Sequence, residues 1–333
     1  AMPDPGAGSR SLEEWLGHYG GLARERIVLG MERVAEVWRR LGAPPLGCPL
    51  ITVGGTNGKG SCVAMLESIG LAAGYRTACY TSPHLLRYNE RIRLDGREID
   101  DAALCAAFER ADRARGDSTL TYFEFGTLAA LDLFVRAGPD VAILEVGLGG
   151  RLDATNAAPS QVAVLTSIGI EHVEYLGHTV EEIAAEKLAI LDEDSFLVSG
   201  NVPPSVVEMA AAAARERGSR WFHLGTDFRI AAAQPAVGGW LVDIEGAEDA
   251  YPDVHLTLHG RHQIDNFAVA AAAVEALLGR PLDADAVREA ATAVTVPGRM
   301  EIAGRDPLIL LDGAHNPHGA ASLGTAIAEE FPT

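Results

Sequence analysis

The chain has 333 residues, of which 48% are hydrophobic and 22% charged, and its formal net charge is −19 at pH 7. This length predicts about two domains with a large core, the acidic charge argues against a nucleic-acid-binding protein, and no apolar run is long enough to cross a membrane. The N-terminal residues lack the features of a signal peptide, and four widely spaced cysteines predict neither a disulfide framework nor a zinc site, so we expect a cytoplasmic protein.

The predicted elements begin with two helices and a strand. Residues 1–10 are expected to be disordered, and Ser11 opens a helix with a capping-box pattern. Apolar residues recur on one face of a second helix over 27–41. A short, β-branched run over 49–53 predicts a buried parallel strand.

The glycine-rich stretch 54–61, Gly-Gly-Thr-Asn-Gly-Lys-Gly-Ser, joins that strand to a helix that ends at Gly74. Glycines let backbone N–H groups approach phosphate oxygens, and the positive end of the helix attracts the anion. Lys59 is placed to reach the terminal phosphates and Ser61 to face a magnesium ion, so we predict a triphosphate site. The spacing differs from the usual P-loop, because only three residues separate Gly54 from the Gly58-Lys59 pair and Gly60 separates the lysine from Ser61. The alternative is a glycine-rich turn without a ligand.

Strands and helices alternate from residue 49 to about 225, which predicts an α/β fold with a doubly wound, mostly parallel sheet. Further strands are expected over 75–81, 141–146, 161–168 and 196–198, and helices over 100–115, 121–137, 179–191 and 203–218.

The pattern changes after this region. Short alternating segments over 227–258 predict a small antiparallel sheet, and two helices follow, ending near residues 278 and 293. A boundary is expected at 297–301. One strand over 308–311 and one helix ending near 331 complete the chain, too little for a domain of its own.

Three polar side chains follow apolar strands: Ser82, Glu145 and His172. Ligands bind at the carboxyl ends of parallel strands, and these groups, with phosphate oxygens and water, would complete a six-coordinate magnesium site. The alternatives are a buried ion pair for Glu145 and a satisfied loop histidine for His172. Beside a triphosphate loop the metal interpretation is favoured. Asp312 and His315 occupy a similar corner between the last strand and the last helix.

For four other charged residues the sequence allows both a functional and a purely structural role. Lys187 is either functional or a solvated helical lysine paired with a neighbouring glutamate. Arg151 and Asp153 either bind an anionic substrate or cap their own loop. Arg299 either reaches a phosphate from the domain junction or is a surface or hinge arginine.

Nine stretches span nearly the whole chain: 54–61, Thr81-Ser-Pro-His-Leu85, Asn89-Glu-Arg-Ile92, 145–156, 166–172, Glu186-Lys187, 262–266, 297–301 and Asp312-Gly-Ala-His-Asn-Pro317. Together they resemble the folylpolyglutamate synthase/dihydrofolate synthase family of the Mur ligase superfamily. The first is shared by the superfamily, whereas 81–85 and 145–156 are particular to folate ligases. The resemblance implies an ATP-binding, P-loop NTPase-like Mur ligase domain over 1–296, and a linker and the beginning of a Rossmann-like C-terminal domain over 297–333.

The resemblance also implies an ATP-dependent ligase of folate biosynthesis and one-carbon metabolism. The carboxylate of dihydropteroate or a reduced folate would attack the γ-phosphate of ATP, and L-glutamate would then displace phosphate from the acyl phosphate. Mg²⁺ is the implied cofactor and ATP the cosubstrate. Positioning and charge neutralisation dominate phosphoryl transfer, which suits the loop. We expect a monomer without nucleic-acid or membrane partners.

Roles for individual residues follow from the same resemblance. The implied catalytic residues are Lys59, His172 and Lys187, the last as a carbamylated lysine. The implied ATP contacts are Asn57, Gly58, Lys59, Gly60, Ser61, Asn266, Arg299 and Asp312. The implied contacts of the pteroate or glutamate substrates are Ser82, Pro83, His84, Arg151, Leu152, Asp153 and His315. The implied metal contacts are Ser61, Ser82, Glu145 and His172.

In the family a full C-terminal domain follows the Asp312–Pro317 corner, so we expect this chain to contain only the start of that domain. Two alternative functions remain. Another Mur-type amide ligase, acting on muramyl peptides or cyanophycin, is disfavoured by the 81–85 motif. A nucleotide-binding module without catalysis is favoured by the short C-terminal part and disfavoured by the intact metal and lysine set.

Overall fold

The structure is a computed structural model that describes residues 10–23, 30–42 and 44–331. Two expectations concern residues outside this part of the chain. They are the disorder expected over 1–10, of which only residue 10 is described, and the start of the helix expected over 27–41, which is described from residue 30. In the described part of the chain, no helix combines the length and hydropathy needed to cross a bilayer.

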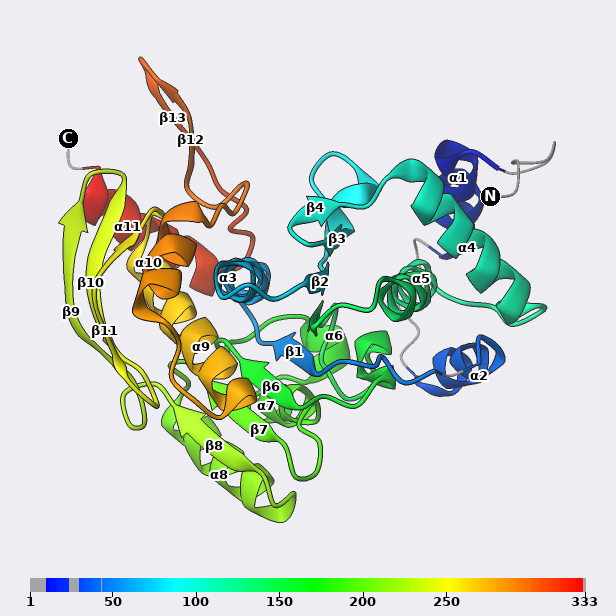
Figure 1. The fold of residues 1–333 in the computed structure, drawn as a ribbon, viewed down its shortest axis with the longest axis horizontal. Helices are drawn as coiled ribbons and strands as arrows, with labels where there is room; N and C mark the ends of the chain where they lie inside the picture. The colour runs from blue at the N-terminus through cyan, green and yellow to red at the C-terminus, as the bar shows by residue number, and fades with distance from the viewer. Residues whose placement is uncertain (1–9, 24–29, 43, 332–333) are drawn as a thin grey trace.

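An eight-stranded sheet forms the centre of the molecule (Figure 1). Its strands are β1 (Leu50–Gly54), β2 (Thr77–Tyr80), β3 (Ile92–Leu94), β4 (Arg97–Glu98), β5 (Val141–Glu145), β6 (Val162–Leu165), β7 (Phe196–Ser199) and β8 (Arg220–His223). Their order is β4-β3-β2-β5-β1-β6-β7-β8; the strands from β2 onward in this order are parallel, and β3 and β4 form an antiparallel edge. The predicted mostly parallel sheet is confirmed.

Helices cover both faces of this sheet. In the described residues they are α1 (Leu12–Ala23), α2 (Glu32–Arg40), α3 (Lys59–Ala72), α4 (Asp101–Arg115), α5 (Tyr122–Ala137), α6 (Val173–Leu176), α7 (Val180–Leu188), α8 (Pro204–Glu216), α9 (Arg261–Leu278), α10 (Ala284–Ala293) and α11 (Pro317–Glu330). Their ends follow local signals. For example, Thr121 and Glu124 form a capping box at the start of α5, and Gly138 ends it in the left-handed conformation.

Successive residues of each buried strand face opposite layers, as the period of two requires. Ile51 of β1 and Ile143 of β5 pack in the cluster that contains α3, α9 and α10. Leu50 and Ala142, one position earlier in each strand, pack in the cluster formed by α1, α2, α4 and α5. Both faces are therefore apolar, and polar groups gather at the strand ends.

The sheet topology creates a crevice at the carboxyl end of β1. The chain leaving β1 runs through α3 to β2, on one side of β1, whereas the chain leaving β6 runs through α7 to β7, on the other side. Neighbouring strands whose connections diverge leave an opening between their carboxyl ends. The glycine-rich stretch after β1 lies at this opening.

A second, antiparallel sheet lies beside α9, as predicted for 227–258. Its strands are β9 (Arg229–Ala236), β10 (Gly239–Glu245) and β11 (Ala250–Leu256), in the order β11-β10-β9. Figure 1 shows it at the opposite end of the molecule from α1 and α2.

The last segment contains more structure than the single strand and helix expected. β12 (Glu301–Arg305) and β13 (Leu308–Leu311) form an antiparallel hairpin that projects from the molecule in Figure 1. β12 was missed because its residues alternate only between exposed and half-buried positions and include a glycine, which leaves a weak apolar signal. The edge hairpin of β3 and β4 was missed for a similar reason, since it is short and charged.

Candidate active site

Residues 54–61 join β1 to α3 and are called the phosphate loop. Two glycines give this loop its shape. Gly55 and Gly58 have φ angles of 140° and 86°. A Cβ on Gly55 would lie 2.0 Å from Oγ1 of Thr166, and a Cβ on Gly58 would lie 2.7 Å from Oδ1 of Asn266. Backbone conformation and close packing therefore both require glycine at these positions.

Replacing Gly58 with alanine is expected to weaken ATP binding about tenfold, because left-handed backbone costs an alanine about 1–2 kcal/mol and its methyl group would displace Asn266. Gly74 gives a matched control, since its φ is 83° but a Cβ at this position would have no atom within 4 Å. Isothermal titration with a non-hydrolysable ATP analogue distinguishes the two variants. Equal affinities of G58A and G74A would contradict this account of the loop.

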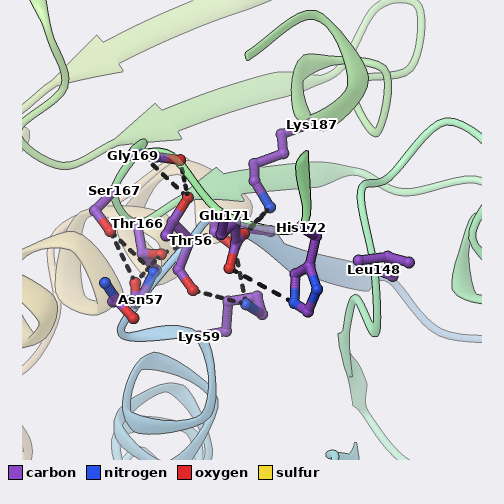
Figure 2. Close-up of polar contacts among 12 residues, drawn as sticks. Thr56, Asn57, Lys59, Leu148, Thr166, Ser167, Gly169, Glu171, His172 and Lys187 are labelled. Atoms are coloured by element: carbon purple, nitrogen blue, oxygen red, sulfur yellow. Dashed lines mark hydrogen bonds and ion pairs between the residues drawn. The ribbon is translucent and has the colours of Figure 1, made fainter. Parts of the chain in front are cut away.

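The segment after β6 holds the phosphate loop from one side (Figure 2). Thr56 donates its backbone N–H to the carbonyl of Ser167 at 2.7 Å, and its hydroxyl donates to the carbonyl of Gly169 at 3.1 Å. The Asn57 carbonyl accepts hydrogen bonds from the hydroxyls of Thr166 at 2.6 Å and Ser167 at 3.1 Å. These contacts fix the loop through the protein's own groups.

The sequence contains only two lysines, and both reach the phosphate loop. Nζ of Lys59 donates to the carbonyls of Gly55 at 2.9 Å and Thr56 at 3.0 Å. Nζ of Lys187, from the last turn of α7, donates to the same Gly55 carbonyl at 3.0 Å and pairs with Oε1 of Glu171 at 2.7 Å. Figure 2 shows the two amines approaching the loop from opposite sides.

Lys187 is only 2% exposed, so the interpretation of it as a solvated helical lysine is wrong. Burial, followed by repulsion from Lys59, lowers the pKa of Lys187 from 10.5 to about 8, although Glu171 opposes this change. The ammonium form therefore still predominates near neutral pH, but the neutral, nucleophilic amine is far more populated than in a lysine with the ordinary pKa.

The lowered pKa predicts a pH dependence of stability. Below about pH 8 the folded and unfolded states both carry the Lys187 proton, and the full cost of burying the ammonium is present. Between about pH 8 and 10.5 only the unfolded state binds that proton, so this group raises the free energy of unfolding with pH, by on the order of 3 kcal/mol.

Urea unfolding of the unmodified chain and of K187M across this range, in buffer free of carbon dioxide, isolates the contribution of Lys187. Buried tyrosines and cysteines titrate in the same range in both proteins and cancel in the difference. A difference in free energy of unfolding that stays constant from about pH 7 to 11 would contradict the assignment.

The predicted metal contacts come from four separate elements. Ser82 follows β2 and Glu145 ends the neighbouring β5, and the Ser82 N–H donates to Oε2 of Glu145 at 2.9 Å. Ser61 lies in the first turn of α3, where its hydroxyl accepts from Nε2 of Gln263 at 3.3 Å. His172 precedes α6 in the left-handed conformation, with a φ of 43°.

These four residues fit a magnesium ion. Burial raises the pKa of Glu145, while Lys59 opposes the change, so a cation beside this carboxylate would offset the cost of its burial. Among the described residues no group of three or more His, Cys, Asp or Glu side chains could hold a metal alone. Mg²⁺ does not require such a cage, because it binds through one or two protein groups together with phosphate oxygens and water.

The phosphate loop and most predicted site residues line one cleft with a volume of about 350 Å³. Its lining includes Asn57, Gly58, Lys59, Gly60, Ser61, Ser82, Pro83, Glu145, His172, Asn266, Arg299, Asp312 and His315. These positions are spread over most of the chain, from residue 57 to residue 315. Basic side chains such as Lys59 and Arg299 line the cleft together with the carboxylates of Glu145 and Asp312. A site for a metal-bound phosphate needs both kinds of charge, because cations face the phosphate and carboxylates face the metal.

The corner before α11 faces the phosphate loop across the cleft. Asn57 and Asn316 exchange two hydrogen bonds through their side-chain amides, at 3.2 and 2.9 Å. Asp312 accepts the N–H groups of Met300 at 2.9 Å and Ala314 at 2.7 Å, and so fixes this corner. The sequence identified Asp312 but gave no signal for the contact between the two asparagines.

Four predicted substrate residues and Lys187 are not among the described residues that line the cleft. His84 accepts from Nε of Arg91 at 2.8 Å, and Arg151 pairs with Glu186 at 2.6 Å. Asp153 is buried and accepts the N–H groups of Leu148 and Thr155. The loop-capping alternative for Asp153 is thus seen directly, and the substrate roles of His84, Arg151, Leu152 and Asp153 stay predictions.

Glu171 is a site residue for which sequence reasoning gave no role. It lines the cleft and pairs with Lys187, and its side chain is only 8% exposed. Its position next to His172, after a buried strand, was a usable signal, because a carboxylate at the carboxyl end of a parallel strand is well placed for ligand chemistry.

Residues 53–274 match the family model described as the Mur ligase middle domain. Among curated proteins, the Escherichia coli dihydrofolate synthase/folylpolyglutamate synthase is 40% identical over 316 residues, which cover 94% of this chain and 71% of that protein. The match therefore spans about seven tenths of the relative's length.

Solved structures similar to this chain come from the same family of enzymes. Mycobacterium tuberculosis folylpolyglutamate synthase complexed with ADP superimposes with a TM-score of 0.92 at 36% identity, covering 96% of this chain and 74% of that one. A bifunctional folylpolyglutamate synthase/dihydrofolate synthase with Mn, AMPPNP and L-glutamate bound gives a TM-score of 0.84 at 38% identity, covering 99% and 76%.

Proposed function

The chain belongs to the Mur ligase middle-domain family and to the dihydrofolate synthase/folylpolyglutamate synthase family, and we propose that it joins dihydropteroate or a reduced folate to L-glutamate with ATP as cosubstrate. The observation that carries this proposal is a single cleft lined by the phosphate loop, Glu145, the start of the 82–87 loop and the 312–315 corner. In this proposal the nucleotide, the metal ion, the acid and the amine meet in that cleft.

The reaction proceeds in two displacements. A carboxylate oxygen of the pteroate or folate attacks the γ-phosphorus of ATP, the bond to the ADP oxygen breaks, and an acyl phosphate forms. The amino nitrogen of L-glutamate then attacks the acyl carbon, the carbon–oxygen bond to phosphate breaks, and the amine proton passes to solvent. The products are the amide, ADP and inorganic phosphate.

The chain's own residues position these groups. Loop N–H groups and the start of α3 hold the phosphates, and Lys59, which the carbonyls of Gly55 and Thr56 keep beside the loop, contacts the terminal phosphate. Ser61, Ser82, Glu145 and His172 would hold Mg²⁺, which would neutralise the phosphate charge when bound. Asn266, Arg299 and Asp312 contact ATP, and His315 contacts glutamate or the nucleotide.

We propose that Lys187 is carbamylated in the active protein. Its neutral amine attacks carbon dioxide, a nitrogen–carbon bond forms and one proton is released. The product is an anion beside Glu171, which lies 2.7 Å from the unmodified amine. Two adjacent buried anions are costly unless a cation offsets their charge, so the carbamate would favour the binding of a metal ion on this side of the cleft.

Residues 297–333 form, in this proposal, the linker and the start of a C-terminal domain, whose corner at 312–316 already meets the phosphate loop. A cytoplasmic, monomeric protein is part of the same proposal, and the four cysteines are free in the structure, as a reducing compartment favours.

Phosphate release measured with ATP, a pteroate acid and L-glutamate tests the proposal. Release is expected only when all three are present. Release that requires a UDP-sugar peptide instead would assign the chain to another Mur-type ligase. Nucleotide binding without any substrate-dependent release by the full-length protein would contradict the ligase assignment.

A further inference from the structure

We infer that Glu90 is a positioning residue for the pteroate or folate substrate, acting through the 82–87 loop; this inference rests on the proposed function. The loop connects β2 to a short 3₁₀ turn, Tyr88–Arg91, and Pro83 of the loop lines the cleft. Glu90 itself does not line the cleft in the described structure, so it acts through the loop.

Both ends of the loop are anchored to the central sheet. At its start, the Ser82 N–H is bonded to Glu145, the candidate metal contact, at 2.9 Å. The preceding Thr81 donates its N–H to the carbonyl of Arg91 at 2.8 Å, which closes the loop at its base. The position of the loop is therefore linked directly to the metal and phosphate side of the cleft.

The Glu90 carboxylate holds the far side of the loop. Its two oxygens accept the backbone N–H groups of Leu85 at 2.7 Å, Leu86 at 2.8 Å and Arg87 at 2.5 Å. Burial alone would raise the pKa of Glu90, but these three N–H groups outweigh burial, and its pKa lies below its usual value. Three charge-assisted hydrogen bonds to one carboxylate fix three consecutive peptide groups.

The next residue, Arg91, holds the loop's histidine. Its Nε donates to Nδ1 of His84 at 2.8 Å, and its guanidinium lies over the rings of Tyr88 and Tyr122 at 5.2 and 5.5 Å. Arg91 is only 8% exposed, so a buried guanidinium holds the half-buried His84 ring. Adjacent residues of one turn thus control four consecutive positions of the loop.

Apolar burial does not hold the loop in place. Leu85 and Leu86 are 62% and 90% exposed, although the hydrophobic effect favours burying leucine. Because their N–H groups bind Glu90, their side chains are held outward, and the polar contacts at Glu90 decide the conformation. Without that carboxylate the loop would lose its shape, and the substrate would have to order it on binding.

Replacing Glu90 with glutamine therefore separates positioning from catalysis. For E90Q we expect the KM for the pteroate or folate acid to rise about tenfold, with kcat and the KM for ATP changed less than about twofold. Glu14 supplies a matched control, because it accepts the Ser11 N–H at 2.7 Å in the same kind of cap, far along the chain in α1. E14Q is expected to leave all three constants unchanged.

Amide hydrogen exchange gives a second readout that does not depend on activity. The N–H groups of Leu85, Leu86 and Arg87 are expected to exchange at least about tenfold faster in E90Q than in the unmodified protein. If E90Q fails to fold, E90D keeps the charge but shortens its reach, and the same pattern is expected at smaller amplitude.

The outcomes distinguish this inference from the proposed function. An unmodified protein that shows no pteroate-dependent phosphate release would contradict the proposed function, while the exchange result would still report on the Glu90 contacts. An active protein in which E90Q leaves the KM for the acid unchanged, or lowers kcat and not affinity, would overturn the inference about Glu90 alone.

Discussion

Replacing Lys59 with alanine is expected to lower the rate of phosphate release by about 10³-fold, because the amine stabilises negative charge that develops on the transferred phosphoryl group. In the structure Nζ of Lys59 donates to two loop carbonyls, at 2.9 and 3.0 Å, so the amine is held next to the phosphate position. Single-turnover phosphate release under saturating ATP measures this effect apart from nucleotide affinity.

The exposed Arg97 of β4 is the matched control for Lys59. R97A removes one positive charge from the surface, and its rate is expected to stay within about twofold of the unmodified rate. K59R keeps the charge but replaces a compact ammonium with a planar guanidinium, so it is not expected to restore full activity. A K59A protein that keeps more than about a tenth of the activity would contradict the role assigned to Lys59.

Replacing Lys187 with alanine is expected to remove activity by more than about 10²-fold and to destabilise the fold. In the uncarbamylated form the loss of stability follows because Glu171, whose side chain is 8% exposed, would remain buried without its ammonium partner, at a cost of about 3–5 kcal/mol. The loss of activity follows from the proposed carbamate, which no alanine can replace.

Chemical rescue tests which form of Lys187 acts. Acetate or formate added to K187A supplies a carboxylate in the place of the carbamate and is expected to restore part of the activity, whereas methylammonium is not. The double variant K187A/E171Q removes the unpaired charge and is expected to recover stability without activity. Rescue by methylammonium and not by acetate would show that the free amine is the working group.

The sequence allowed the parallel sheet, the phosphate loop and most of the cleft to be predicted, because these depend on local signals. Gly54 to Ser61 carry their geometry in their own residue types, and Ser82, Glu145 and His172 each follow a recognisable apolar run. Since the carboxyl ends of parallel strands meet, the convergence of these side chains followed from topology.

What was missed depends on contacts between distant positions. The pairing of Lys187 with Glu171 makes a helical lysine a buried one, and nothing in the spacing of α7 shows this. The contact between Asn57 and Asn316 joins residues from the two ends of the chain. Glu90 has no unusual neighbour in sequence, and its role follows only from the path of the loop that it holds.

The central claim is that one cleft transfers the γ-phosphoryl group of ATP to the carboxylate of a pteroate or folate. The most direct test uses that acid with ¹⁸O in its carboxylate groups, ATP and L-glutamate, followed by mass spectrometry of the released phosphate. The account predicts one ¹⁸O atom in each phosphate formed, because the carboxylate oxygen that attacks phosphorus leaves with it. Phosphate without ¹⁸O, formed while the amide is made, would contradict the acyl-phosphate route.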